Sequence, residues 1–202
     1  MKTITLPASV DRLDERVEQF VRPYRGRRLD GPAHLLSSAA DRSRVWLVIG
    51  AAQVYRGRRG NTVHSPVPPI AGILVVGLES AIVHAFLKRA FQRQRPDALV
   101  SLRFGARRPP SSAFPSGHAA SAATAAMVLG TSAPESAALL MLAAAIGWSR
   151  VHTGLHHASD VIAGFLLGTA VGACSRALAT RIQQHTNSVF LIVVPRGSGG
   201  IK

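Results

Sequence analysis

The sequence is poor in cysteine, lysine, aromatic and acidic residues, and each shortage excludes a class of protein. A single cysteine, Cys174, excludes an internal disulfide framework, and its apolar surroundings predict a small core residue. Only ten acidic residues oppose 24 basic ones, nearly all arginine, which leaves a formal net charge of +14. This excess favours nucleic acid, anionic lipid or an anionic substrate as the partner. Because aromatic residues make up only 5% and no nucleic-acid motif is recognisable, we expect no nucleic acid partner.

The N-terminus lacks the apolar run of a cleavable signal peptide, since Asp11, Asp14, Glu15 and Glu18 follow soon after Met1. Charged residues make up only 17% of the chain, and its mean hydropathy is positive. Both values are typical of membrane proteins rather than of soluble domains. We therefore expect internal helices to insert into the bilayer.

Three segments are expected along the chain: a basic N-terminal segment (1–43), a membrane domain (44–182) and a C-terminal tail (183–202). In the first segment, apolar residues between Val10 and Val21 recur at helical spacing, which predicts an amphipathic helix. Such a helix can lie on the membrane surface or pack on its own domain, and the sequence favours neither. The end of the tail is expected to be disordered.

The apolar segments predict an all-α fold, a polytopic membrane helical bundle of about five to six helices. Ile70–Leu87 is the clearest spanning helix. Arg44–Tyr55, with 12 residues, is shorter than the roughly 20 that cross a bilayer. Further helices of membrane or near-membrane length are predicted over Ser116–Gly130, Ser132–Trp148 and Asp160 to about Leu178.

Two features of these helices each allow two interpretations. Glu79 and His84 are ionisable residues at membrane depth, which indicates either a functional site or hydrogen bonds that tie helices together. Gly164, Gly168 and Gly172 recur every four residues, a spacing that lets helices approach closely in lipid. We expect these glycines to make contacts within the bundle rather than between two copies of the chain.

The first stretch with chemical content contains Lys88 and Arg95, seven residues apart and therefore on one face of a continuing helix. There they would place an ammonium and a guanidinium on one anion just outside the membrane. The alternative is that they only flank the bilayer, as we expect of Arg89 and Arg93.

The second stretch is Pro115-Ser116-Gly117-His118, where a loop enters a helix. The N–H groups of a helix N-terminus, a residue without Cβ and the Ser116 hydroxyl together make an anion cradle. His118 is placed to protonate a leaving oxygen. The alternative is a simple helix cap followed by a surface histidine.

The third stretch contains Arg150, His156 and Asp160. In helical geometry Asp160 lies one turn from His156, where it can accept from Nδ1–H and leave Nε2 to attack phosphorus. Arg150 offers a forked donor for two phosphate oxygens. His152 shares the spacing of four, which leaves a metal site as a less favoured alternative, and His157 is a rival nucleophile.

Together these stretches resemble the three signature motifs of the type 2 phosphatidic acid phosphatase (PAP2) superfamily. The resemblance covers roughly residues 70–180 and matches Lys-x6-Arg-Pro, Pro-Ser-Gly-His and Ser-Arg-x5-His-x3-Asp. It implies an integral protein of the cell (plasma or inner) membrane, with its catalytic site at the membrane–water interface. It also implies metal-independent hydrolysis of a lipid phosphate, without a cofactor and with no obligate protein partner.

The resemblance also implies a role for each matching residue. His156 would be the nucleophile that forms a phosphohistidine, Asp160 would orient it, and His118 would be the general acid. The phosphoryl oxygens would be held by the remaining motif residues: Lys88, Arg95, Ser116, Gly117 and Arg150. For these roles His156 must be neutral and His118 must be protonated, so activity is expected to be bell-shaped in pH.

The substrate and the membrane side stay open at this stage. Phosphatidic acid, phosphatidylglycerophosphate, polyprenyl phosphates and polyprenyl-linked phosphosugars are all candidates. A lipid phosphotransferase or a non-catalytic binder of anionic lipid are the alternatives, whereas the apolar helices argue against a soluble vanadate haloperoxidase. The membrane face expected to carry the site, formed by residues 1–44, 88–117 and 149–159, holds 17 of the 24 Lys and Arg. By the positive-inside rule this favours a cytoplasmic site, although many PAP2 enzymes act on the outer face. Six-helix members have two spanning helices before the first motif, where this chain offers one short candidate.

Overall fold

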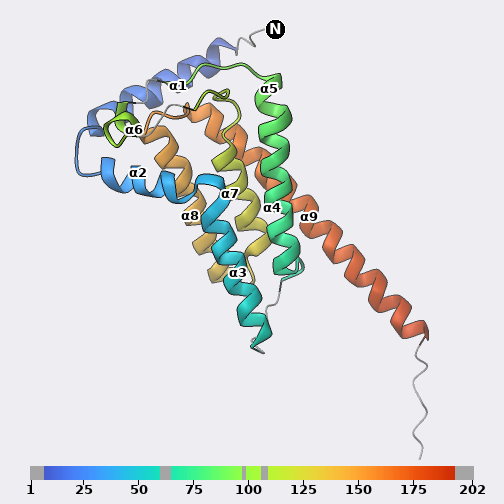
Figure 1. Cartoon of the computed structure of the whole chain (residues 1–202). Coiled ribbons are helices and arrows are strands. Elements are labelled where there is room, and N and C mark those ends of the chain that lie inside the picture. The colour runs from blue at the N-terminus through green and yellow to red at the C-terminus, as the bar shows by residue number, and fades with distance from the viewer. Residues whose placement is uncertain (1–6, 60–64, 97–98, 106–108, 194–202) are drawn as a thin grey trace, which may run out of the picture.

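The chain folds into a helical bundle with a cap of shorter helices at one end (Figure 1). The computed structural model describes residues 7–59, 65–96, 99–105 and 109–193, and no strand occurs in these ranges. The bundle is formed by α3 (Arg44–Arg58), α4 (Pro69–Ile82), α7 (Gly117–Leu129), α8 (Ala133–His152) and α9 (Ala158–Val193). The predicted all-α architecture is therefore confirmed for the described residues.

The cap consists of α1 (Ala8–Val21), α2 (Asp30–Ala39) and the short α6 (Leu99–Arg103). Figure 1 shows α1 lying across the end of the bundle, close to where α5 (Lys88–Ala90) ends. The described helices therefore outnumber the five or six predicted, because the N-terminal segment adds helices of its own. Of the two placements considered for the first helix, packing on its own domain is the one observed.

Helix α7 lies at the centre of the bundle, where its small residues let α9 approach closely. Along α7 nearly every residue from Gly117 to Leu129 is buried. A Cβ added at Gly168 would stand 2.1 Å from the carbonyl oxygen of Ala120, and one at Gly164 would stand 2.4 Å from that of Ser116. The predicted glycine contacts within the bundle are confirmed, and they hold the start of α9 against the start of α7.

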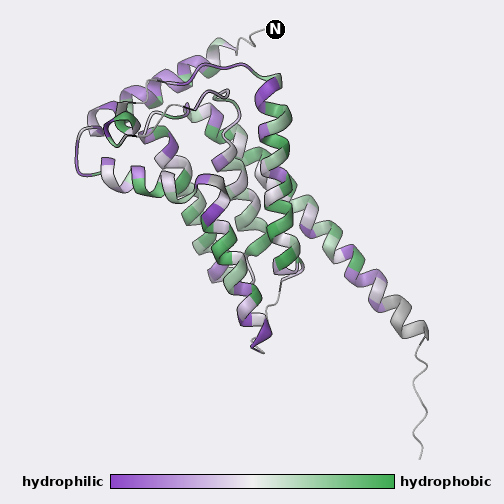
Figure 2. Ribbon diagram, viewed as in Figure 1, coloured by the Kyte–Doolittle hydropathy of each residue, from purple (hydrophilic) through white to green (hydrophobic). Residues whose placement is uncertain are grey.

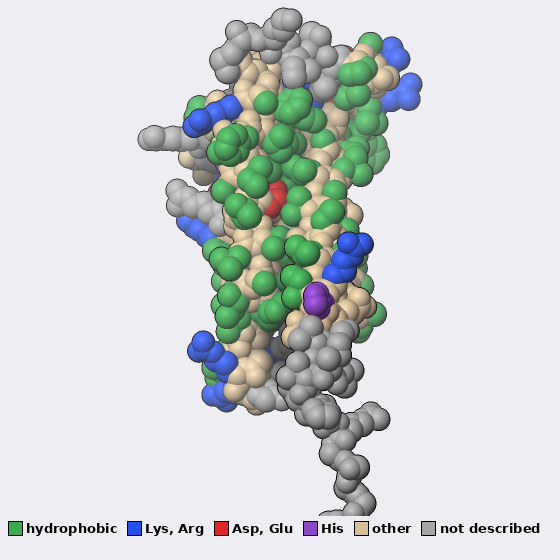
Figure 3. Space-filling model, turned by 90° about the vertical axis from the view of Figure 1, so that its right-hand side faces the viewer, with side chains coloured by type: hydrophobic (Ala, Val, Ile, Leu, Met, Phe, Trp, Pro, Cys, Tyr) green, Lys and Arg blue, Asp and Glu red, His purple; other side chains and the backbone are tan. Residues whose placement is uncertain are grey.

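The middle of the bundle is apolar on its outer surface, whereas polar residues collect at its ends (Figures 2 and 3). By length and composition, Pro69–Ala90 and Ala158–Asn187 are the described helices able to cross a membrane. Leu74, Leu78 and Leu166 on these helices are each about two-thirds exposed, at 67%, 64% and 68%. The expected four spanning or nearly spanning helices are thus reduced to two, since α7 has only 13 residues and the 20 residues of α8 include Glu135, Ser149 and Arg150.

Two details of the predicted organisation were wrong. Helix α9 continues to Val193 instead of ending near Leu178. Cys174 lies exposed on this helix rather than in the core, because its face of α9 points away from α7. The tail beyond Val193 lies outside the described residues.

Candidate active site

The three motifs, spread from residue 88 to residue 160, converge at the capped end of the bundle. Lys88 lies in the last turn of the long helix that begins with α4, and Ser116 caps α7. Arg150 lies in the last turn of α8, and Asp160 lies in the first turn of α9. His156 lies in the short loop between α8 and α9. All five are at least nine-tenths buried.

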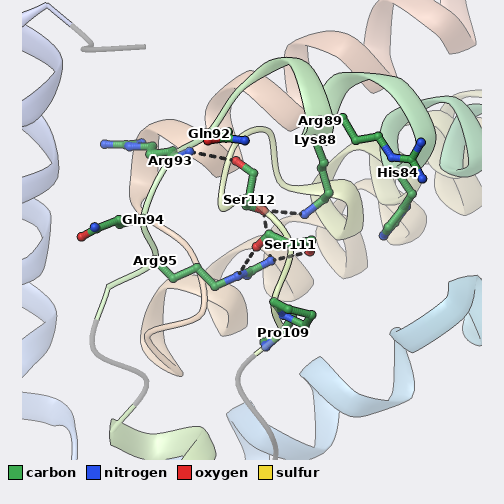
Figure 4. Close-up of a pocket in the computed structure, with 11 residues that line it drawn as sticks. His84, Lys88, Arg89, Gln92, Arg93, Gln94, Arg95, Pro109, Ser111 and Ser112 are labelled. Atoms are coloured by element: carbon green, nitrogen blue, oxygen red, sulfur yellow. Dashed lines mark hydrogen bonds between the residues drawn. The ribbon is translucent and has the colours of Figure 1, made fainter. Parts of the chain in front are cut away.

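The first motif reaches this point by a route that helical spacing did not predict. A π-helical turn (η3, Val83–Leu87) follows α4, a feature frequent at functional sites, and the helix then ends at Ala90. Because Phe91 is extended, Lys88 and Arg95 do not share a helix face. They meet instead on one carbonyl oxygen, that of Ser112, with Lys88 Nζ at 3.0 Å and Arg95 Nη2 at 3.1 Å (Figure 4).

The second motif forms the start of α7. The Ser116 hydroxyl accepts from the N–H of Ala119 at 3.4 Å, which is the predicted cap, while its own N–H donates to the carbonyl oxygen of Asp160 at 3.0 Å. A Cβ at Gly117 would stand only 3.1 Å from His84 Cε1, so the absence of a side chain permits this packing. His118 Nε2 lies 2.8 Å from Asp41 Oδ1.

The third motif brings a guanidinium and an imidazole together. Arg150 Nη1 donates to the Ser37 hydroxyl, and the carbonyl oxygen of Arg150 accepts from the backbone N–H of His156 at 3.2 Å. Arg95 Nη1 lies 3.2 Å from His156 Nε2. Since arginine only donates, Nε2 must present its lone pair, and the neutral ring then carries its proton on Nδ1.

His156 and Asp160 face each other, but the hydrogen bond expected between them is not closed. Nδ1 and Oδ2 are 3.7 Å apart, and Nδ1 has no hydrogen-bond partner among the described residues. Asp160 Oδ2 accepts from the backbone N–H of His157 at 2.8 Å, and Oδ1 accepts from Arg93 Nη1 at 2.6 Å. Arg93, expected merely to flank the bilayer, is therefore bound to the carboxylate of the third motif.

The alternative metal site is not assembled from the three residues that suggested it. His152 turns away from His156, and its Nε2 lies 2.9 Å from Asp30 Oδ1. Within the described ranges, no three His, Cys, Asp or Glu side chains form a cluster with metal-binding geometry.

Glu79 and His84 behave differently although they lie on the same helix. The Ser121 hydroxyl donates to Glu79 Oε2 at 2.9 Å, which ties α4 to α7 as the structural interpretation expected. His84 is exposed, and its Nδ1 lies 2.8 Å from the carbonyl oxygen of Ser80. Its ring packs against Gly117, at the edge of the site.

The sequence interpretation missed the contribution of the N-terminal segment. Six of the ten acidic residues lie in residues 1–43. In so basic a chain, this concentration was the signal from which their role could have been predicted. Buried cations need partners, and acidic residues concentrated in one segment are candidates for that role. The residues concerned are Asp14, Asp30 and Asp41, together with the hydroxyl of Ser37.

The site is strongly cationic, which controls the protonation of both histidines. Burial, with the charges of Arg150 and Arg95, holds the pKa of His156 well below its usual value. Burial and Arg150 also lower the pKa of His118 to about 4, although Asp41 opposes the shift. Burial tends to raise the pKa of Asp41, but the hydrogen bond and charge of His118 outweigh it, so this pKa is lowered. A bound phosphate dianion would raise the pKa of both imidazoles.

Two grooves meet at the site. The first, of about 950 Å³, is lined by Lys88, Arg95 and the Pro109–Ser112 loop (Figure 4). The second, of about 830 Å³, opens between α3 and α4 beside His118. His84 and Pro109 line both, so the grooves adjoin. The second groove is polar beside His118, where Asp41 lines it, and apolar farther along α3 and α4, where Leu47 and Gly77 line it.

This arrangement suits a tetrahedral anion attached to an amphiphilic group. Three cations and the start of α7 surround the nitrogen of His156, while a second histidine stands at the mouth of the adjoining groove. Positive charge fixed in this way stabilises the transition state of phosphoryl transfer.

Comparisons with known proteins agree with this geometry. The family model of the PAP2 superfamily matches residues 69–184. Curated relatives include the decaprenylphosphoryl-5-phosphoribose phosphatase of two Mycobacterium tuberculosis strains, each 36% identical over 105 residues. That alignment covers 50% of this chain and 57% of the relative, so the chain spans little more than half the length of the relatives it matches.

Two solved structures share the fold. A transmembrane PAP2-type phosphatidylglycerolphosphate phosphatase from Bacillus subtilis superposes with a TM-score of 0.68 at 23% identity, over 87% of this chain and 89% of that one. Aquifex aeolicus LpxE superposes with a TM-score of 0.62 at 25% identity, over 86% of this chain and 98% of that one.

Proposed function

The chain belongs to the PAP2 superfamily, and on that premise we propose that it is an integral membrane phosphatase that hydrolyses a lipid-linked phosphate without a metal ion. One observation carries the proposal: His156 Nε2 presents its lone pair at the centre of a buried cationic site, 3.2 Å from Arg95. A phosphate drawn into that site meets a nucleophile already in the correct tautomer. The two long apolar helices would anchor the enzyme in the cell membrane.

In the first step, His156 Nε2 attacks phosphorus. The substrate draws the N–H groups of Arg95 onto its own oxygens, which releases the Nε2 lone pair. A bond forms between Nε2 and phosphorus while the bond from phosphorus to the lipid oxygen breaks, and that oxygen takes the proton of His118. Lys88 and Arg150 offset the charge on the transferring oxygens, with the N–H groups at the start of α7 as further donors.

In the second step, water replaces the enzyme on phosphorus. Neutral His118 takes a proton from the attacking water, the new oxygen–phosphorus bond forms, and the bond to Nε2 breaks. Inorganic phosphate leaves, and His118 is again protonated for the next cycle. During both steps the phosphorylated His156 ring carries positive charge, which the Asp160 carboxylate stabilises once the 3.7 Å gap to Nδ1 closes.

The groove beside His118 indicates the kind of leaving group. Because His118 protonates the departing oxygen, the leaving group must occupy this groove. Asp41, which lies against His118, makes its near end polar, and Leu47 and Gly77, farther along α3 and α4, make its far end apolar. The leaving group is therefore amphiphilic, with a polar unit next to the phosphate and a hydrocarbon chain beyond it. A polyprenyl-linked phosphosugar, as named for the curated relatives, has this order and is our preferred substrate class.

The test is phosphate release from a panel of lipid phosphates by the detergent-purified chain in the presence of EDTA. The panel contains a polyprenyl-linked phosphosugar, a polyprenyl diphosphate, phosphatidic acid and phosphatidylglycerophosphate. Release that survives EDTA supports the metal-free mechanism, and the substrate with the highest kcat/KM identifies the class. Phosphate transfer to an added lipid alcohol, with little release to water, would establish the phosphotransferase alternative instead.

Filling the apolar end of the groove should weaken binding of long-chain substrates only. A Cβ at Gly77 meets nothing within 4 Å, so Gly77→Phe should fold normally while its ring occupies the groove. We expect KM for a long-chain lipid phosphate to rise about tenfold or more, because the hydrocarbon chain loses its contacts. KM for a short-chain analogue should change less than threefold.

The matched control is Leu78→Phe, which adds a ring on the outer face of the same helix. It should leave both KM values near those of the wild type. Equal effects of Gly77→Phe on long and short substrates would contradict the placement of the lipid chain.

The pH profile should reflect the lowered pKa of His118. A phosphate monoester has a second pKa of about 6. The pKa of His118 is about 4, so between pH about 4 and about 6 the free histidine is neutral and the substrate is a monoanion. Together they carry the one proton that the leaving oxygen must receive. We expect kcat/KM to be highest from pH about 4 to about 6, and to fall about tenfold per pH unit above that range. A maximum above pH 8 would contradict the role of His118.

A further inference from the structure

The N-terminal segment lies before the part of the chain that matches the family model, yet it contacts the catalytic end at many points. Arg25 donates to the carbonyl oxygens of His152 and Val151 at the end of α8, at 2.8 and 3.0 Å, and also pairs with Glu18. Further contacts join Asp30 to His152, Ser37 to Arg150 and Asp41 to His118.

Asp14 is the most deeply connected residue of α1. It is only 6% exposed, and its Oδ1 accepts from the backbone N–H of Ser159 at 2.8 Å. Its Oδ2 accepts from the Ser159 hydroxyl at 2.6 Å and from Arg93 Nη2 at 2.5 Å. The other terminal nitrogen of the same guanidinium binds Asp160. A single arginine therefore joins α1 to the carboxylate that faces His156.

We propose that Asp14 is a positioning residue for His156, acting through Arg93 and Asp160. The proposal rests on the proposed function, in which His156 is the nucleophile. Asp14 itself stays remote from the substrate, and its effect is transmitted by one shared guanidinium. The helix that carries it is thereby part of the catalytic apparatus.

The charge balance explains why two carboxylates are needed. Burial acts to lower the pKa of Arg93, but the hydrogen bonds and charges of Asp14 and Asp160 outweigh it, so the guanidinium stays charged. Shared between two carboxylates, it leaves the trio with a net charge of −1. That charge stabilises the cation formed when His156 is phosphorylated. Without Asp14, Arg93 and Asp160 form a neutral pair, and the stabilisation is lost.

Geometry acts in the same direction. Asp160 Oδ2 must approach Nδ1 of His156 by less than 1 Å to close a hydrogen bond, starting from 3.7 Å. Arg93 holds the other oxygen of Asp160, and Asp14 holds Arg93 from the opposite side. Losing Asp14 lets the guanidinium bind both oxygens of Asp160 and withdraw them from the imidazole.

The other charged groups around the relay do not replace Asp14. His156 is faced by the side chains of Lys88 (α5), Arg95 (the following loop), Arg150 (α8) and His118 (α7), all of which lower its pKa. On the other side of Arg93, the carboxylate of Asp11 stands 3.9 Å away and is 58% exposed, so solvent screens it.

The test compares Asp14→Asn, Asp14→Glu, Arg93→Gln and the double variant Asp14→Asn/Arg93→Gln, using the full-length chain in detergent. The Asn side chain keeps the acceptor for Ser159 but removes the charge. We expect kcat to fall about 10- to 100-fold with KM and melting temperature little changed. The acid limb of kcat, where His156 of the enzyme–substrate complex gains a proton, should move to lower pH, because His156 becomes less basic. Asp14→Glu should restore kcat to within about threefold, and the double variant should lose no more than Arg93→Gln alone.

Glu18→Gln provides the control for docking of α1, because it removes the ion pair to Arg25 without touching Arg93. It should lower the melting temperature without shifting the acid limb. A normal kcat in Asp14→Asn, or the same loss in Glu18→Gln with an unmoved limb, would overturn the relay. The proposed function is judged separately: it fails if wild-type turnover does not require His156, whereas only the relay fails if His156 is required and Asp14 is not.

Discussion

Replacing His156 with alanine should lower phosphate release by about 10⁴-fold or more and abolish the phosphoenzyme. The reason is positional: Nε2 is the proposed nucleophile in the cationic site, 3.2 Å from Arg95 Nη1. The measurement is rapid quenching with a substrate labelled on phosphorus. The wild type should retain an acid-labile, base-stable label on the protein, and the variant should retain none.

His157→Ala is the matched control, since the two histidines are neighbours and both are candidates from the sequence. Alanine at this position keeps the backbone N–H that binds Asp160 at 2.8 Å. We expect less than a fivefold loss of kcat and normal labelling. Labelling that persists in His156→Ala but disappears in His157→Ala would show that His157, and not His156, is the nucleophile.

The helical architecture and the grouping of the motifs could be predicted from sequence because both depend on local patterns. Apolar segments identify α4 and α9, and the glycines at 164 and 168 indicate the face of α9 that packs on α7. Residues as distant as Lys88 and Asp160 were expected in one site from the order of their motifs. The structure brings these residues to one end of the bundle.

Local geometry was less predictable, because it depends on where helices end. Lys88 and Arg95 were expected to share a face only if the helix continued, but it stops at Ala90. The two cations still meet at Ser112, which lies in the loop before α7. The carbonyl oxygen of Ser112, shortly before the second motif, therefore holds the two cations of the first motif together.

The partners of the catalytic groups could not be predicted, because they come from a segment with two equally good placements. An amphipathic helix can cover a membrane or a protein surface, and its polar face is similar in both cases. Only the docked position shows that Asp14 is buried against Arg93. Asp14 and Arg93 are 79 residues apart in the sequence, so no periodic pattern indicates that they pair.

The same contacts explain how so cationic a site folds without its substrate. Buried charges are costly unless paired, and the site contains Lys88, Arg93, Arg95 and Arg150. Acidic side chains from the cap pair with Arg93 and approach Arg150, and carbonyl oxygens take the donors of Lys88 and Arg95. These partners are weaker than a phosphate dianion, so the substrate can displace them.

Replacing His118 with alanine should cause a loss that depends on the leaving group. An alkyl alcohol leaves poorly without a proton, so we expect kcat to fall about 10²- to 10⁴-fold with a lipid phosphate. A nitrophenolate leaves without protonation, so the loss with a short aryl phosphate should stay below about tenfold. The measurement is kcat for both substrates in the wild type and the variant, with a series of aryl phosphates to give the dependence on leaving-group pKa.

Asp41→Asn tests whether the same ring is tuned by its partner. The amide keeps a hydrogen-bonding group 2.8 Å from His118 Nε2 but removes the charge that opposes the lowering of its pKa. The alkaline limb of kcat for the lipid phosphate, where His118 of the enzyme–substrate complex loses its proton, should therefore move to lower pH, while hydrolysis of the aryl phosphate changes little. If His118→Ala slows both substrates equally, the histidine binds phosphate instead of protonating the leaving group, and the proton must come from the substrate itself or from water in the adjoining groove.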